Sequence, residues 1–218
     1  MSLTALLLLA DGRLPSGGHA QSNGVEAAVG AGFLGDVPSL HRFLLTRLRS
    51  SGAVTAALAA AACSGWDLTL LDAEADARIP LPALRDASRS QGRALLRVCA
   101  AAWPRAAYAA AGPRPHAPVV LGLAAAAAGC APGDATLAAA YAAVTGPASA
   151  AVRLLGLDPL AVHAMLAHLA PETDRVAASA AQQVADGLLC RWSSPLLDIL
   201  GAAHAGAADR GEVTLFAS

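Results

Sequence analysis

Few residues in this sequence could do chemistry, and they are widely spaced. Of the six histidines, only His163 and His168 are close along one expected helix. A spacing of five residues turns them away from a shared helical face. The four cysteines contain no Cys-x-x-Cys pair, so neither a zinc site nor a dithiol redox motif is predicted. We therefore expect no metal-binding residues.

The short motifs of common catalytic sites are also missing. A phosphate-binding loop requires a Gly-Lys-Ser/Thr ending, whereas the spacing after Gly12 gives Gly17-Gly18-His19 and the chain has no lysine. Neither a Gly-x-Ser-x-Gly elbow nor a His-Glu-x-x-His pair occurs. We predict no catalytic residues and expect the protein not to be an enzyme.

Two arginines, Arg153 and Arg89, are the remaining candidates. Arg153 stands alone in an apolar helical stretch, where an arginine usually reaches solvent but can also hold a phosphate bidentately. Arg89 lies in the most polar predicted helix face, between Arg85 and Arg93. Such a face is ordinarily solvated, and a binding role is the alternative.

A glycine-rich bend precedes most of the helical sequence. The apolar run Leu6 to Ala10 leads into Leu14-Pro15-Ser16-Gly17-Gly18-His19, and Ser22-Asn23-Gly24-Val25-Glu26 follows. Glycine permits backbone angles closed to other residues, and proline fixes φ. We predict a short helix, a shaped turn, and a second helix through Glu26 that is capped by the preceding hydroxyl or amide side chains.

Composition favours packed helices. The 218 residues are 56% hydrophobic, 14% charged and only 4% aromatic, with alanine and leucine abundant. We predict an all-α, single-domain helical bundle of roughly eight to ten helices covering 1–218. A net charge of −1 argues against nucleic acid as a partner.

The longest uncharged stretch, Ala135 to Val152, does not predict a membrane span. It is mostly alanine, which is nearly neutral in transfer to lipid, and a break or kink of its helix is expected at Thr145-Gly146, before Pro147. The apolar N-terminal run has no basic region before it, so no signal peptide is predicted. We expect a soluble, cytoplasmic protein, with a membrane-associated helical protein as an alternative.

Five ordered segments resemble those of the UreF family of urease accessory proteins. They are the bend with the helix start that follows it (Leu14 to Glu26), Arg89-Ser90-Gln91-Gly92, His116-Ala117-Pro118-Val119-Val120, the small-residue helix through Arg153, and Pro195-Leu196-Leu197-Asp198-Ile199, which is expected to open a last short helix. The C-terminal tail departs from the family pattern, because Thr214-Leu215-Phe216-Ala217-Ser218 lacks both basic positions.

The resemblance implies a non-enzymatic chaperone of nickel insertion. It would act as a homodimer that bridges the D/H-type urease accessory protein and the GTPase UreG during delivery of nickel to apo-urease. Nickel and GTP would be handled by these partners, with no cofactor bound stably by this chain. An all-α small-molecule-binding or regulatory protein is the alternative.

The resemblance also implies which residues bind partners. The matching position of Arg153 works with the GTPase, and Leu215 and Phe216 would supply apolar anchors in the tail. A frayed terminus is the other interpretation of that tail. The residues expected to bind partners are Leu14, Pro15, Gly17, Gly18, His19, Glu26, Arg89, Arg153, Leu215 and Phe216.

Overall fold

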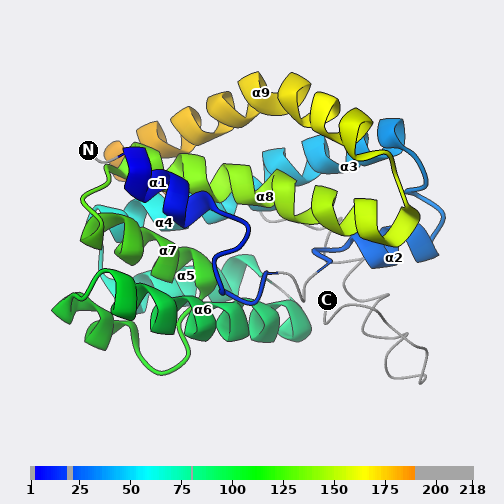
Figure 1. The fold of residues 1–218 in the computed structure, drawn as a ribbon. Helices are drawn as coiled ribbons and strands as arrows, with labels where there is room; N and C mark the ends of the chain where they lie inside the picture. Colours follow the sequence, from blue (N-terminus) through cyan, green and yellow to red (C-terminus); the bar gives the residue numbers. More distant parts are fainter. Residues whose placement is uncertain (1–2, 19–21, 80, 190–218) are drawn as a thin grey trace.

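The computed structural model describes residues 3–18, 22–79 and 81–189, and these ranges are helical with no strand (Figure 1). The predicted all-α class is confirmed. The helices are α1 (Leu3–Ala10), α2 (Val25–Gly30), α3 (Val37–Arg47), α4 (Ala53–Cys63), α5 (Leu68–Arg78), α6 (Pro82–Ala102), α7 (Ala117–Ala127), α8 (Pro132–Leu155) and α9 (Pro159–Ala185). A π-helical segment, Leu48–Gly52, joins α3 to α4, and a 3₁₀ segment spans Ala106–Ala111.

The bundle is built around α4 and α8. The long helices α8 and α9 lie side by side, and α4 packs against α7, α8 and α9 (Figure 1). On the far side of α7 from α9, α6 forms the opposite edge of the molecule (Figure 1). The core has two parts, one around α4 and α7 and the other around α2, α3 and the adjoining faces of α8 and α9.

Small residues set the distance between helices in the first part of the core. Seven consecutive residues of α4, Ala56 to Ala62, are buried, and six of them are alanine. A Cβ atom added at Gly122 of α7 would lie 2.1 Å from the carbonyl oxygen of Ala59. The two backbones approach so closely that only glycine fits at this crossing.

The sequence Asp36-Val37-Pro38-Ser39 predicts a helix start, because Asp36 or Ser39 can cap a helix and Pro38 suits its first turn, and the start of α3 confirms it. Asp36 accepts a hydrogen bond from the backbone N–H of Ser39, with Pro38 in the first turn. From there the sequence predicts helix to about Cys63 with a weak point at Gly52, and the structure has the π-helical segment Leu48–Gly52 between α3 and α4, which ends at Cys63.

Of the break or kink expected at Thr145-Gly146, the break does not occur, because α8 runs without interruption through Pro147. Proline lacks the N–H that would bond the carbonyl of Ala143, four residues earlier. That carbonyl instead accepts a hydrogen bond from Arg47 Nε at 3.1 Å. A tertiary contact therefore offsets part of the local cost that the sequence predicted.

By length and composition, α8 could cross a membrane. In this fold, however, 61% of its apolar window is buried against other helices. The core helix of a globular protein passes the same test, so the hydrophobicity of α8 is explained by its packing.

Candidate functional site

The glycine-rich bend lies against α6. It begins with a hydrogen bond from the backbone N–H of Leu14 to the carbonyl of Asp11, and Leu14 packs on the core. Gly17 has a φ of 78°, in the left-handed region that favours glycine. A Cβ at Gly18 would lie 3.4 Å from the side-chain nitrogen of Gln91. The bend and the Arg89–Gly92 segment, both singled out in the sequence, therefore meet in the structure, while Pro15 remains exposed.

The segment after the bend turns through two left-handed residues before α2 begins. Asn23 has a φ of 53° and Gly24 a φ of 86°. Gly24 occupies the N-cap position and no side chain caps the helix, so the predicted hydroxyl or amide cap was wrong. The Asn23 side chain instead accepts a hydrogen bond from Arg47. Glu26, which is partly buried, lies in the first turn of α2, where a negative charge complements the helix dipole.

Arg89 of α6 is held inside an ion-pair cluster. Its Nη2 atom lies 2.8 Å from Asp72 Oδ2 and 2.7 Å from Asp76 Oδ2, and both carboxylates belong to α5. The same guanidinium donates to the carbonyl of Arg114. With 16% of its side chain exposed, Arg89 joins α5, α6 and the loop before α7 and offers little surface to a partner.

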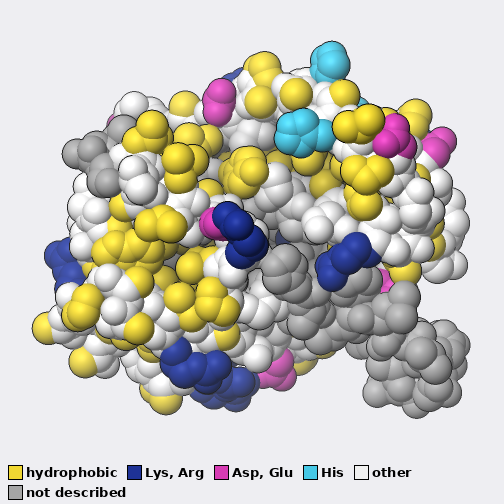
Figure 2. Space-filling view, viewed as in Figure 1, with side chains coloured by type: hydrophobic (Ala, Val, Ile, Leu, Met, Phe, Trp, Pro, Cys, Tyr) yellow, Lys and Arg dark blue, Asp and Glu magenta, His cyan; other side chains and the backbone are white. Residues whose placement is uncertain are grey.

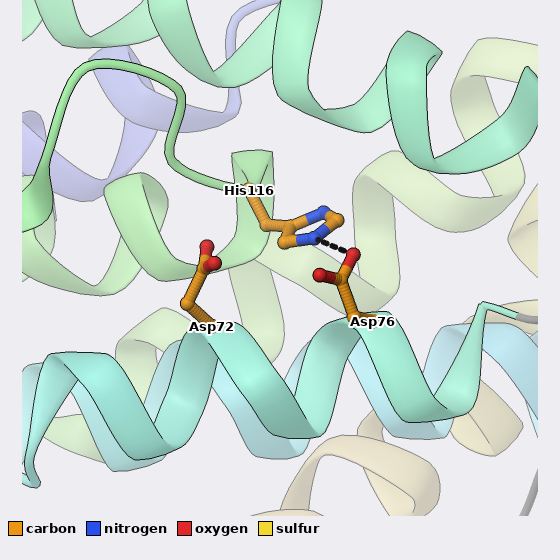
Figure 3. A group of neighbouring side chains, drawn as sticks. All are labelled: Asp72, Asp76 and His116. Carbon is orange, nitrogen blue, oxygen red and sulfur yellow. Dashed lines mark hydrogen bonds and ion pairs between the residues drawn. The ribbon is translucent and has the colours of Figure 1, made fainter. Parts of the chain in front are cut away.

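His116, the residue preceding α7, completes this cluster (Figure 3). Its side chain is fully buried, with Nε2 3.0 Å from Asp76 Oδ1 and Nδ1 3.0 Å from Ser88 Oγ. Burial lowers the pKa of His116, and this effect exceeds the raising effect of the bond to Asp76. The ring is therefore neutral at pH 7, and the bonding pattern assigns its proton to Nε2, which donates to Asp76.

Burial would raise the pKa of Asp76, but hydrogen bonds from His116 and Arg89 and the charge of Arg89 outweigh it. The pKa of the carboxyl group is consequently lowered, so Asp76 is ionised at neutral pH. The hydrogen bond to Asp72 is the main cause of a raised pKa for Arg89. The cluster thus joins two aspartates to Arg89 and a neutral imidazole, with Arg85 at its edge, 3.9 Å from Asp76.

The same cluster contains the arrangement of a small metal site. One ligand atom each from Asp72, Asp76 and His116 lies within 4.8 Å of the others. Arg89 already pairs with both carboxylates, and Arg85 Nε lies 3.9 Å from Asp76 Oδ1, so a metal ion would have to compete with these guanidinium groups. The sequence interpretation missed this cluster, although Asp72 and Asp76 are spaced four residues apart on one helix face, which was the available signal.

Ser88, His116 and Asp76 are also the residue types of a nucleophilic triad. A triad histidine must take up the proton of the serine, and the carboxylate must stabilise the resulting imidazolium. Here burial lowers the pKa of His116, and Arg89 is already bound to Asp76. Both features disfavour the imidazolium, so the chain of hydrogen bonds is suited to joining helices.

Arg153 lies elsewhere, in the exposed last turn of α8. Gly156, with a φ of 64°, ends that helix, and the positive charge complements its C-terminal dipole. The short helix α2, which follows the bend, packs against α8, and the last turn of α8 carries Arg153. His19, Leu215, Phe216 and the last helix expected near Pro195 lie outside the described residues.

The fold and this site define a class of all-α proteins in which polar side chains join helices and shape a surface beside a glycine-rich bend. The UreF family model matches residues 34–170. The chain belongs to the UreF family.

Curated relatives cover the whole chain. Proteins named urease accessory protein UreF are 46% identical over 218 residues in Mycobacterium sp. (strain JLS) and 47% identical over 219 residues in Mycobacterium marinum. Each comparison covers 100% of this chain and 99% of the relative. A relative of the same name from Mycolicibacterium vanbaalenii is 45% identical over 93% of this chain and 94% of its own length.

Proposed function

We propose that this chain is a urease accessory protein, a non-enzymatic chaperone of nickel insertion. It forms one domain over residues 1–218 and acts in the cytoplasm. The observation that carries the proposal is its full-length similarity, at 46–47% identity, to relatives named urease accessory protein UreF. In this role it bridges the D/H-type accessory protein and the GTPase UreG, as a homodimer, while apo-urease receives the metal.

The chemistry of the candidate site supports a scaffold. The charged and polar side chains of the cluster bind one another: Arg89 donates to Asp72 and Asp76, and His116 bonds to Asp76. These hydrogen bonds hold the helices together. Nickel and GTP are then handled by the partner proteins, and this chain binds neither stably. Partner contacts come from Glu26 in the first turn of α2, from Arg153, and from the residues of the bend and the tail: Leu14, Pro15, Gly17, Gly18, His19, Leu215 and Phe216.

Exposed apolar surface also supports partner binding. Leu3, Leu7 and Leu8 of α1 are each more than half exposed. Figure 2 shows apolar side chains gathered on the side of the molecule where Figure 1 places α1 and α7. Clustered apolar side chains of this kind are typical of surfaces that another protein covers.

The small-molecule alternative has weaker support. A hollow between α8 and α9 is lined by Leu137, Tyr141, Val144, Thr145, Leu166, Ala170, Thr173 and Asp174, and its volume is about 110 Å³. Ligand pockets usually occupy roughly 300–1,000 Å³. A hollow of this size accommodates a side chain more readily than a metabolite.

Light scattering after size exclusion tests the proposal. The chain is co-expressed with the D/H-type accessory protein, and UreG with GTP is then added. We expect the mass of one peak to grow at each step. A peak that takes up neither partner would overturn the proposal.

Two variants locate the contacts. Arg153→Ala is expected to lose UreG but retain the D/H-type protein, whereas Arg42→Ala, which removes an exposed arginine of α3, should keep both. Deleting residues 211–218 should weaken the complex through loss of Leu215 and Phe216. An intact complex after deletion would favour the frayed-terminus interpretation of the tail.

A further inference from the structure

Arg47, the last residue of α3, joins three segments that are distant in sequence. Its Nε atom donates to the carbonyl of Ala143 in α8 at 3.1 Å. Its Nη1 atom donates to the carbonyl of Asn23 at 3.1 Å, and Nη2 donates to the side-chain oxygen of Asn23 at 3.2 Å. One guanidinium thus ties the segment before α2 to the middle of α8.

The bond to Ala143 supplies what α8 lacks. In a regular helix, that carbonyl would accept from the N–H of residue 147, but Pro147 has none. A carbonyl left without a partner in a buried helix is costly. Ala143 is buried, so Arg47 replaces the missing intrahelical donor.

The other end of the guanidinium holds an unusual backbone conformation. Asn23 has a φ of 53° and is the only residue other than glycine with a positive φ among the described residues. Asparagine adopts this region more easily than most residues, at a modest cost. Because Arg47 binds both the carbonyl and the side chain of Asn23, it fixes the turn that leads into α2.

The backbone that carries Arg47 is also irregular. The π-helical segment Leu48–Gly52 begins directly after it, and such segments often occur at functional sites. A Cβ at Gly52 would lie 3.2 Å from the carbonyl of Arg47 and 3.3 Å from the Cβ of Ala143. Glycine at this position thus lets α8 approach the segment that presents Arg47.

Every acceptor that the structure gives the guanidinium is a neutral oxygen. Burial lowers the pKa of Arg47 to about 10, which still leaves the group charged at pH 7. Arg47 is partly buried and has no anionic partner among the described residues, so removing its charge from water costs free energy that a contact between neutral groups would not require. The two terminal nitrogens of the guanidinium bind the carbonyl and the side-chain oxygen of Asn23 together, which the single ammonium group of a lysine could not reproduce.

We propose that Arg47 is a positioning residue, which fixes the segment from Ser22 to Gly30 on α8 and so sets the geometry of the partner-binding surface between the bend and Arg153. The anchoring follows from the contacts of Arg47, Asn23 and Ala143. Its consequence for partner binding rests on the proposed function.

Anchoring is tested on the isolated chain by amide hydrogen exchange. In Arg47→Met, the amides of residues 24–30 should exchange faster, whereas Arg42→Met, a matched change at an exposed position of α3, should leave them unchanged. The fall in Tm caused by Arg47→Met should also be smaller when Pro147→Ala restores an N–H to the Ala143 carbonyl. Unchanged exchange together with additive Tm shifts would overturn the anchoring.

Partner binding is tested by titrating UreG with GTP into the complex that each folded variant forms with the D/H-type accessory protein, because Arg153 is the residue expected to bind UreG. Arg47→Met should weaken the complex by about tenfold, because an unanchored segment must be ordered on binding. Arg47→Lys should fall between Arg47→Met and the wild type. If Arg47→Met does not fold, Asn23→Gly removes one acceptor while tolerating the left-handed backbone, and a smaller loss is expected.

The outcomes separate the two proposals. Wild-type affinity in both Arg47→Met and Asn23→Gly would overturn the positioning role and leave the proposed function intact. If the wild-type chain bound no urease accessory protein, the proposed function and the binding role of Arg47 would both fall. Hydrogen exchange would still decide whether Arg47 anchors the segment.

Discussion

Gly92 of α6 offers a direct test of how closely this fold is packed. A Cβ atom at this position would lie 2.0 Å from the carbonyl oxygen of Pro115 and 2.9 Å from the backbone carbon of His116. Both obstacles are backbone atoms, and both distances are well inside the 3.4 Å at which ordinary contact begins. The substitution Gly92→Ala therefore cannot be accommodated by a rotamer change, and α6 must move away from the loop before α7.

The expected change in the free energy of unfolding combines two costs with one gain. Overpacking a close contact costs about 1–3 kcal/mol and occasionally more. Moving α6 also stretches the bonds from Ser88 to His116 and from Arg89 to the Arg114 carbonyl, each worth about 1 kcal/mol. Replacing a helical glycine by alanine returns about 1 kcal/mol. We expect a net destabilisation of about 3 kcal/mol.

Thermal unfolding followed by circular dichroism measures this effect. For a chain of this size, about 3 kcal/mol lowers the Tm by roughly 6–12 °C. Gly133→Ala is the matched control, because Gly133 lies in the first turn of α8 and a Cβ there would meet nothing within 4 Å. The control should leave the Tm unchanged or raise it slightly. If Gly92→Ala behaved like Gly133→Ala, the close approach of α6 to Pro115 would be refuted.

Three further predictions concern titration and reactivity. Hydrogen bonds from Arg175 and Arg49 lower the pKa of Glu172 to about 2, so this carboxylate stabilises the fold above its usual pKa of 4.5 and that stabilisation is lost as pH falls toward 2. Because both arginines are exposed, denaturant titrations at several pH values should show that Glu172→Gln removes about 1 kcal/mol of this pH-dependent stability. An unchanged dependence of the unfolding free energy on pH would contradict the prediction. Burial lowers the pKa of His116 below 6.5, so as pH falls the unfolded chain takes up a proton first and the free energy of unfolding should decrease below about pH 6.5. His116→Gln should reduce this decrease, whereas His163→Gln, at an exposed position, should not. The same dependence of the unfolding free energy on pH in both variants would count against a buried neutral ring. A fluorophosphonate probe, read by mass spectrometry, should leave Ser88 unmodified, and labelling that disappears in Ser88→Ala would show that the serine is activated after all.

The sequence predicted the helical class and the places where helices begin better than it predicted what joins them. Composition and the Asp36-Val37-Pro38-Ser39 start are local signals, and both were confirmed. The continuous path of α8 through Pro147 could not be predicted from the local sequence, because the Ala143 carbonyl finds its donor in Arg47, about 100 residues before the proline. The cap expected on α2 was wrong for a similar reason, since the Asn23 side chain serves Arg47 instead of the helix end.

The candidate site was predicted in part. The bend and the Arg89–Gly92 segment were both singled out from the sequence, and their contact appears only in the structure, where Gly18 lies beside Gln91. The cluster of Asp72, Asp76 and His116 was missed, since it joins α5 to the residue before α7 and no local pattern specifies how these two segments pack. Which of these residues bind partners stays a prediction.

A core made largely of alanine explains why this fold relies on such contacts. Alanine side chains are short and alike, so sliding one helix along another exchanges one alanine contact for a similar one. Buried polar groups are costly unless they meet their partners, and they therefore select one arrangement over its neighbours. The bond from Arg89 to Asp72 fixes the position of α6 against α5. The bonds from Arg47 to Asn23 and Ala143 fix the position of the segment before α2 against α8. Gly92 and Gly122 act in the same sense, because each permits one close backbone approach that any shift would lose. Removing these few contacts should therefore loosen the surface geometry before the helices themselves unfold.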